Sequence, residues 1–280
     1  MLTEPLKYLL KAMGMARSTY CFEIGRTDGV AEKNADLSCE IRKIFEHHYG
    51  RYGVRRVHRE LLKQGYTVNR KRVQRLMHCT GLRGKLPREK YHSCQGKVGK
   101  IAPNIIDRDF ETTAPLQKWT ADVTQFGFPF GTCYLSPILD MHTNETVSYD
   151  LSPSPHLTQI KRMLHRAFRK FPHTEGLTVH SDQGWQYQHA QYQHESKAHG
   201  IIQSMSRKGN CYDNCIMETF FGRLKNEMYY GCEKEYPSFT SFSKAIKNYI
   251  HYYNERIQIK TKWMPPVKYR IASISRSSEQ

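Results

Sequence analysis

Lys118-Trp-Thr-Ala-Asp-Val-Thr-Gln-Phe126 combines apolar and β-branched residues in a pattern that predicts a strand. Asp122 lies within it. A second acid, Asp182, follows a short apolar run at 177–180, in the segment His-Ser-Asp-Gln-Gly-Trp-Gln-Tyr. A third, Glu218, lies in a segment that predicts an amphipathic helix, with thirty-five residues between it and Asp182. Two acids at the ends of strand-like runs and one on a helix therefore form a single pattern.

Outward from this stretch, the sequence alternates between strand and helix patterns. We expect strands at 118–126, 132–140, 146–151, 177–180 and 201–205, and helices at 157–171, 190–199 and 215–230. The order β-β-β-α-β-α-β-α predicts a mixed α/β layered domain over residues 115–232. A further helix at 239–256 and an irregular tail containing Pro265-Pro266 make up a C-terminal segment, 233–280.

The three acids suit phosphoryl transfer. Phosphodiester cleavage places charge on the attacking and leaving oxygens, and two metal ions about 3.5–4 Å apart can stabilise both. Mg²⁺ prefers carboxylate oxygen, so three carboxylates on rigid strands and a helix predict a site for two Mg²⁺ or Mn²⁺ ions. The protein then contributes positioning and charge stabilisation, with little covalent chemistry of its own.

Other acids compete with these three for a catalytic role. Asp140 ends a predicted strand and is a candidate fourth ligand, while Asp150 and Glu227 carry no further signal. Asp213 directly precedes the Glu218 helix, so we expect it to be the N-cap.

Two polar residues are expected beside the Glu218 helix face. Lys225 lies seven residues after Glu218, and seven steps of about 100° bring both side chains to one face of a helix. An ammonium there could hold a DNA phosphate, although an ordinary surface lysine is the alternative. Asn214 lies four residues before Glu218, on the same side, and is a second DNA-binding candidate.

The net charge points to a polyanionic partner. The 280 residues carry +17, with a pI of about 9.5. Residues 41–100 hold 17 Lys and Arg against 3 acids, so most of the excess lies in one segment. Nucleic acid is the first expectation for such a concentration of charge.

Residues 37–82 predict a small all-α domain with three short helices. A tight turn at 65–69 precedes the last helix, and Thr67 or Asn69 can cap it. This is a helix-turn-helix pattern. Basic and amide side chains lie off the apolar stripe of the last helix, where they could contact phosphates and base edges. They are Arg70, Lys71, Arg72, Gln74 and Arg75.

The remaining segments carry weaker signals. Residues 1–36 predict a short helix ended by Gly14, the start of a second near residue 15, and a polar loop at 25–36, while 83–114 predicts a basic linker. A zinc site from His47, His48, Cys79 and Cys94 lacks the usual paired spacings. The sequence shows neither a signal peptide nor an apolar run of membrane-spanning length, so we expect a cytoplasmic, nucleoid-associated protein with reduced thiols.

The residues quoted so far belong to longer matching motifs. From residue 104 to 269 the chain resembles the OrfB-type transposases of bacterial insertion sequences. These are DDE transposases, and their core belongs to the retroviral integrase superfamily. Residues 49–81 resemble the helix-turn-helix that precedes that core. The matching stretches are 118–124, 180–184 with Tyr187, 204–214, 218–221 with Leu224 and Lys225, and 253–257 with Pro266 and Tyr269.

This resemblance implies an RNase H-like catalytic core with Asp122, Asp182 and Glu218 as metal ligands. Cys215, where the family commonly has Ala, is a mild departure. The implied activity is cleavage and joining of insertion-sequence ends: water nicks the element end, and the freed 3′-OH then attacks a phosphodiester. The implied partners are duplex DNA, further copies of the chain in a DNA complex, and an upstream-frame protein joined by ribosomal frameshifting.

Two rival functions remain from the sequence. The first is an RNase H-like nuclease that only cleaves, and the basic helical domain argues against it. The second is a DNA-binding regulator that has kept the fold without catalysis. The presence of all three acids argues against this second rival.

Overall fold

The computed structural model describes residues 6–85, 100–208 and 210–277. The chain divides into two compact units, Met1–Lys85 and Leu86–Gln280. Each unit is described by itself.

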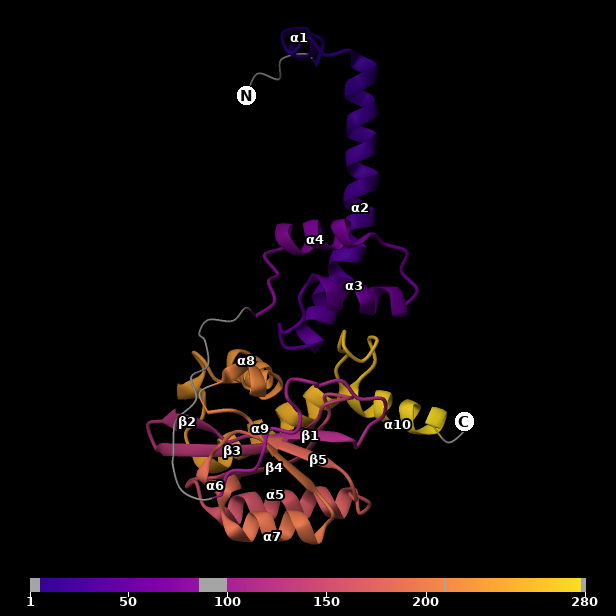
Figure 1. The fold of residues 1–280 in the computed structure, drawn as a ribbon. Coiled ribbons are helices and arrows are strands. Elements are labelled where there is room, and N and C mark those ends of the chain that lie inside the picture. The colour runs from indigo at the N-terminus through magenta and orange to yellow at the C-terminus, as the bar shows by residue number, and fades with distance from the viewer. Residues whose placement is uncertain (1–5, 86–99, 209, 278–280) are drawn as a thin grey trace. The chain divides into compact units, whose positions relative to one another are not determined.

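The first unit is helical (Figure 1). Its helices are α1 (Leu6–Ala12), α2 (Arg17–His47), α3 (Val54–Lys63) and α4 (Arg70–Cys79). The expected loop at 25–36 is wrong, because these residues lie inside the 31-residue helix α2. The segment has no proline, and a polar sequence without proline is as compatible with an exposed helix as with a loop.

The C-terminal half of α2 packs with α3 and α4 around a small apolar core. Ile41, Val57, Leu61 and Val73 are fully buried there. Burial of such a side chain stabilises a fold by about 1.5–3 kcal/mol. The side chain of Asn69 accepts a hydrogen bond from the Lys71 amide at 2.8 Å, so the predicted cap of α4 is confirmed.

The second unit is built on a six-stranded mixed sheet. Its strands are β1 (Lys118–Ala121), β2 (Thr124–Phe128), β3 (Gly131–Asp140), β4 (Thr146–Ser152), β5 (Thr178–Ser181) and β6 (Ile202–Met205). β3 pairs with β1, β2 and β4 in antiparallel fashion, and β5 lies parallel between β1 and β6. The sheet edge beyond β3 is therefore β4.

Helices complete the second unit. They are α5 (Leu157–Lys170), α6 (Trp185–Gln188), α7 (Ala190–Ala198), α8 (Cys215–Met228), α9 (Phe239–Glu255) and α10 (Pro266–Ser277), with short 3₁₀ turns η1 (Cys211–Asn214) and η2 (Glu233–Glu235). The expected irregular tail is wrong, because α10 begins at Pro266. Proline suits the first position of a helix, where its missing N–H would have no helical partner.

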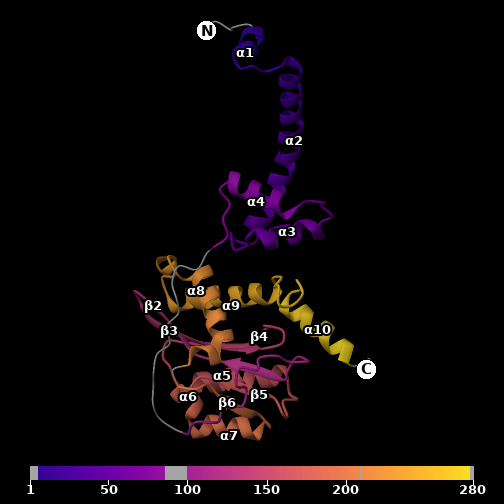
Figure 2. The ribbon, with the colours of Figure 1, turned by 45° about the horizontal axis from the view of Figure 1, so that its top comes forward.

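Two apolar clusters cover the two faces of the sheet (Figure 2). On one face, α5 and α7 pack on the sheet through Met163, Leu164 and Tyr192. On the other face, α8 and α9 pack through Phe221, Leu224 and Ile246. The α8 helix is thereby fixed against the face of β1 and β3, which positions Glu218.

The predicted strand at 118–126 is interrupted where Asp122 stands. β1 ends at Ala121 and β2 begins at Thr124. The Asp122 carboxylate accepts a hydrogen bond at 2.7 Å from the backbone N–H of Val123, the residue that follows it. This local bond replaces a ladder contact and ends β1 at the acid.

Candidate active site

The parallel pairing of β1 and β5 places two of the three predicted acids at one sheet edge. Ala121 pairs with Ser181 at the last register position of both strands. Asp122 and Asp182 each follow directly, so they leave adjoining strands at the same end. The Gly184 amide donates to Oδ1 of Asp182 at 2.9 Å, which turns the chain sharply after the acid.

The third acid reaches this edge from α8. Glu218 lies in the first turn of the helix and is half-buried, while Met217 and Phe221 on the buried face hold α8 to the sheet. Acids are favoured in the first turn of a helix by its dipole. Glu218 is near enough to Asp122 for its charge to affect that group.

The pKa values of all three acids are raised. Burial raises the pKa of Asp122 well above its ordinary value, and the neighbouring charges of Asp182 and then Glu218 raise it further. Burial also raises the pKa of Asp182 and of Glu218. Without a nearby positive charge, burial therefore disfavours the ionised form of each of the three carboxyl groups.

These acids lack the counter-charges that hold Glu145, Asp150, Asp213 and Glu227. Among the described residues, neither Asp122, Asp182 nor Glu218 forms an ion pair. By contrast, the remaining buried acids with charged partners are held as follows: Glu145 by Lys170 and Arg270, Asp150 by Arg162 and Arg166, Asp213 by Arg108 and Arg207, and Glu227 by Arg256. The negative charge of the site is thus open to an external cation.

The acids do not close around one point. Within the described part of the chain, no group of three or more His, Cys, Asp or Glu side chains gathers closely enough to hold a metal ion. Asp122 is instead the acid whose pKa is raised by the charges of both Asp182 and Glu218. The zinc site from His47, His48, Cys79 and Cys94 finds no support in the described residues, and Cys94 lies outside them.

Asn214 bridges α8 and the sheet. Its amide donates to Oδ2 of Asp122 at 2.9 Å, and its own oxygen accepts from the Thr120 hydroxyl at 3.4 Å. The side chain is buried. The structure therefore places this predicted DNA-binding residue on Asp122, where its donor lowers the pKa of that acid against the effect of burial.

Asp213 is not the N-cap of α8, and that expectation is wrong. The N-cap position is Asn214, and the Asp213 carboxylate instead accepts from Arg207 at 2.8 and 2.9 Å and from Arg108 at 3.1 Å. Hydrogen bonds from Arg207 hold the pKa of Asp213 far below its usual range. Two arginines outcompete a helix terminus for one carboxylate.

His180 connects the same turn to β5, a role that the sequence pattern did not reveal. One ring nitrogen lies 2.9 Å from the Asp213 carbonyl oxygen and the other lies 2.9 Å from the Ser204 hydroxyl. Burial lowers the pKa of His180. Both residues that His180 contacts belong to the 204–214 motif. The presence of His180 and this motif in one sequence was the signal available.

Asp140 lies at the wrong end of the sheet for a fourth ligand. It pairs in register with Trp119, near the start of β1, three residues before Asp122. Its carboxylate accepts from the backbone of Leu116, His142 and Thr143. Asp140 is therefore engaged in the turn after β3.

Lys225 shares the α8 face of Glu218, but the side chain is buried, with 8% exposed. Its ammonium lies over the Phe126 ring, 5.2 Å from the centroid. The ordinary surface lysine is thereby excluded, while contact with DNA stays a prediction.

In the first unit, the predicted DNA-binding side chains on α4 divide into two groups. Arg70, Lys71, Gln74 and Arg75 are exposed. Arg72 is half-buried and donates to Oδ1 of Asn34 on α2, from Nε at 3.2 Å and from Nη2 at 3.0 Å. Arg72 therefore links α4 to α2, and the exposed four present their polar groups to solvent.

Similarity to known proteins identifies the class to which this chain belongs. Residues 112–211 and 218–274 match the integrase core domain family, and residues 31–90 match an HTH-like domain family. The chain is 43% identical over 267 residues to a putative transposase, InsK, for insertion sequence element IS150 of Escherichia coli K12, covering 95% of this chain and 93% of that protein. It is 50% identical over 215 residues to an uncharacterized transposase-like protein of Haemophilus influenzae Rd, covering 76% and 98%.

The chain belongs to the insertion-sequence transposases with an integrase core domain, which are DNA polynucleotidyl transferases. The predicted fold class is confirmed: a mixed α/β integrase core preceded by a helical HTH-like region. Among solved structures, the magnesium-bound catalytic core of HTLV-2 integrase is similar at 15% identity and a TM-score of 0.46, covering 56% of this chain and 97% of that one. None of the helices that the structure describes has the length and apolar character of a membrane span.

Proposed function

We propose that this transposase cleaves and joins the ends of an insertion sequence by two-metal phosphoryl transfer, with Asp122, Asp182 and Glu218 as the metal ligands. The observation that supports the proposal is that Asp122 is affected by the charges of both Asp182 and Glu218, while none of the three acids has an ion-pair partner among the described residues.

The donor set fits two divalent cations such as Mg²⁺ or Mn²⁺. Such ions take carboxylate oxygen, and Oδ2 of Asp182 and both oxygens of Glu218 accept no hydrogen bond from the described residues. Bound there, the ions would supply charge stabilisation to the attacking and leaving oxygens. Asp122 is affected by the charges of both other acids, and Asn214 orients it by holding Oδ2 at 2.9 Å.

The chain's own residues position DNA. The HTH-like domain offers exposed Arg70, Lys71, Gln74 and Arg75 for contact with the element end. Lys225 lies on α8, seven residues after Glu218, and is assigned to contact with the reacting strand. Water attacks first at the element end, and the 3′-OH then attacks a target phosphodiester, so each P–O bond formed replaces one P–O bond broken. Further copies of the chain and an upstream-frame partner would complete the assembly on DNA.

The experiment compares Asp122→Asn, Asp182→Asn and Glu218→Gln in a strand-transfer assay with labelled element ends. Each variant should lose joining by about 100-fold or more, because a charged ligand becomes a neutral amide of the same shape. Each should keep its thermal unfolding temperature or raise it, because a repelling buried charge is removed. Binding of Mn²⁺ should weaken in each variant.

Glu195→Gln on α7 is the matched control, because Glu195 is ion-paired with Lys161. It should join DNA at the wild-type rate. A triad variant that joins normally would remove that residue from the ligand set. Wild-type protein that nicks DNA but never joins it would favour the nuclease alternative instead.

A further inference from the structure

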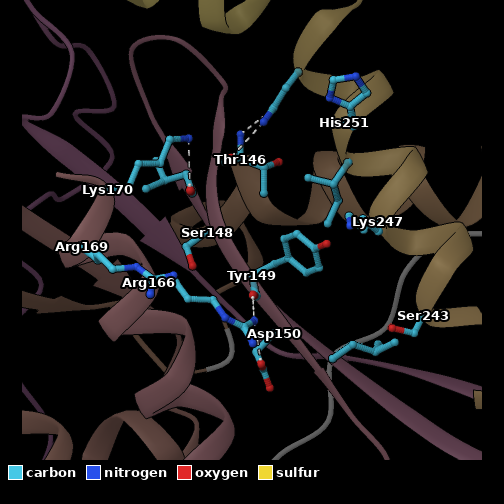
Figure 3. A pocket seen from close by; sticks show the side chains of 14 residues that line it. Thr146, Ser148, Tyr149, Asp150, Arg166, Arg169, Lys170, Ser243, Lys247 and His251 are labelled. Carbon is cyan, nitrogen blue, oxygen red and sulfur yellow. Dashed lines mark hydrogen bonds and ion pairs between the residues drawn. The ribbon is translucent and has the colours of Figure 1, made fainter. Parts of the chain in front are cut away.

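A basic groove of about 870 Å³ runs along the outer edge of β4 (Figure 3). Residues 146–151 of β4 form its floor, α5 forms one wall and α9 forms the other. β4 pairs with β3 alone among the described strands, so this edge faces away from β1 and the acids. Two strand spacings separate β4 from β1, roughly 10 Å across the sheet.

Cations outnumber acids around the groove. The Asp150 carboxylate lies 2.7 Å from Arg162 and 2.8 Å from Arg166. Just beyond the start of β4, the Glu145 carboxylate lies 2.7 Å from Lys170 and 2.6 Å from Arg270. Each of these two carboxylates is therefore bonded to two cations, so each group of three side chains has a net charge of +1.

Two more cations face the groove without an acid. Arg169 on α5 and Lys247 on α9 line opposite walls, and both are exposed. Neither has an ion-pair partner among the residues that the structure describes. His251, one turn beyond Lys247 on α9, adds a polar ring to the same wall. Positive charge on both walls suits an anion lying between them.

An added β-strand is a poor occupant. The outward carbonyl of Tyr149 accepts from Arg166 at 2.8 Å, and that of Val147 accepts from Lys170 at 3.4 Å. The backbone N–H of Thr146 donates to Oδ1 of Asn254 at 2.8 Å, and its carbonyl oxygen accepts from Nδ2 of Asn254 at 3.0 Å. Side chains thus occupy the groups that a further strand would need.

A second copy of the chain is also a poor occupant, because a two-fold contact here would place the cations of one copy against those of the other. The length of the groove argues against a single free phosphate. Six strand residues span about 20 Å. This matches about six nucleotides along one strand of a duplex, at about 3.4 Å each.

We propose that the groove binds the phosphodiester backbone of duplex DNA, with Arg169 and Lys247 contacting phosphates from opposite walls. This is a contact surface separate from the acid cluster and from the HTH-like domain. It rests on the proposed function only in taking DNA as the partner. Because a backbone contact carries no base information, binding at the groove should be independent of sequence.

The test measures the affinity of the full chain for a duplex of arbitrary sequence, as a function of salt and without divalent metal. Arg169→Ala combined with Lys247→Ala should reduce the slope of log affinity against log salt by about 1.8, since each phosphate contact contributes about 0.9. The control removes two exposed lysines, Lys197 on α7 and Lys268 on α10, which do not line the groove. Lys197→Ala with Lys268→Ala should leave the slope unchanged.

Photo-cross-linking gives a second, charge-neutral measurement. Benzoylphenylalanine at Ser243, which lines the α9 wall, should cross-link to duplex DNA, whereas the same group at Lys197 should not. Equal slopes in wild type and the groove variant, with no cross-link at 243, would overturn the proposal. So would a loss of self-association in the groove variant with no change in slope, which would identify a second copy as the occupant.

A further arm separates DNA from free phosphate. Inorganic phosphate that raises the thermal unfolding temperature of wild type but not of the groove variant, with DNA slopes equal, would assign the groove to a small anion and overturn the DNA contact. None of these readouts requires strand transfer. A failure of the groove proposal is therefore distinct from a failure of the proposed catalytic function.

Discussion

Asn214 donates from its side-chain amide to Oδ2 of Asp122 across 2.9 Å, and so joins the N-cap residue of α8 to the acid that directly follows β1. The two residues are 92 positions apart in the sequence. This bond fixes the orientation of Asp122 relative to the helix that carries Glu218. It also offsets part of the repulsion that Asp122 receives from the other two acids.

Removal of this bond should impair catalysis more than folding. We expect Asn214→Ala to lower joining by about 10–100-fold, the usual effect of losing a group that orients a metal ligand. Asn214→Asp should be worse, because it places a fourth carboxylate beside Asp122. The measurement is joining at saturating DNA over a Mn²⁺ titration, with the Mn²⁺ requirement expected to rise. Unaltered joining in Asn214→Ala would mean that Asp122 is oriented by its other contacts.

The exposed α4 arginines should contact phosphates. Arg70→Ala with Arg75→Ala should weaken duplex binding and reduce the salt slope by about 1.8. The matched control is Lys43→Ala with Lys63→Ala, which removes two cations that pair with Glu40 and Glu60 on α2 and α3. Equal losses in the two double variants would remove α4 from its assigned role.

Arg72 should behave differently from its exposed neighbours on α4. Its two hydrogen bonds to Asn34 are structural, so Arg72→Ala should reduce the free energy of unfolding of the first unit by about 1 kcal/mol. Urea unfolding followed by circular dichroism measures this change.

Lys225 should act through its charge. Lys225→Met keeps an apolar stem against Phe126, so the free energy of unfolding should change by no more than about 2 kcal/mol, the size of a desolvated cation–π contact. Joining should nevertheless fall, while Lys225→Arg should stay partly active because the charge persists in a different shape. Mn²⁺ affinity should not change in either variant, since ammonium is not a metal ligand. Full joining activity in Lys225→Met would assign the lysine to packing alone.

The Asp213 carboxylate should make the free energy of unfolding depend on pH. Hydrogen bonds from Arg207 hold its folded-state pKa below the unfolded value of about 3.9. Its contribution is therefore complete above about pH 4 and is lost as the pH falls towards the folded-state pKa. Asp213→Asn should reduce the free energy of unfolding by about 1.5–3 kcal/mol at pH 7. Urea titrations at pH 7 and pH 3 should show that difference shrinking in acid, and a constant difference would contradict the role assigned to the carboxylate.

The sequence predicted the core well where chemistry and periodicity agreed. The strand pattern at 177–180 placed Asp182 just after the end of β5, whereas the pattern at 118–126 predicted one strand through Asp122 and missed the break between β1 and β2. The helical pattern from residue 215 matched the start of α8. A buried face of a strand or helix requires apolar residues at regular spacing, so this spacing can be recognised in the sequence. The catalytic roles of the three acids stay predictions.

The remaining features depend on contacts that periodicity does not encode. The long helix α2 passes through a polar segment, where no apolar stripe reports on it. Asp213 has the spacing of an N-cap, and only the folded chain brings Arg108, more than one hundred residues earlier, to its carboxylate. The β4 groove likewise joins a strand and two helices that are distant in sequence.

The buried pair of Arg256 and Glu227 has a mechanical consequence. The Arg256 guanidinium, from the C-cap residue of α9, bonds to the Glu227 carboxylate on α8 and lies 4.8 Å from the centroid of the Tyr253 ring. Separating the two would strand a charge in the interior, at about 3–5 kcal/mol. The pair therefore makes it energetically costly to separate α8, which carries Glu218, from α9, which carries Lys247.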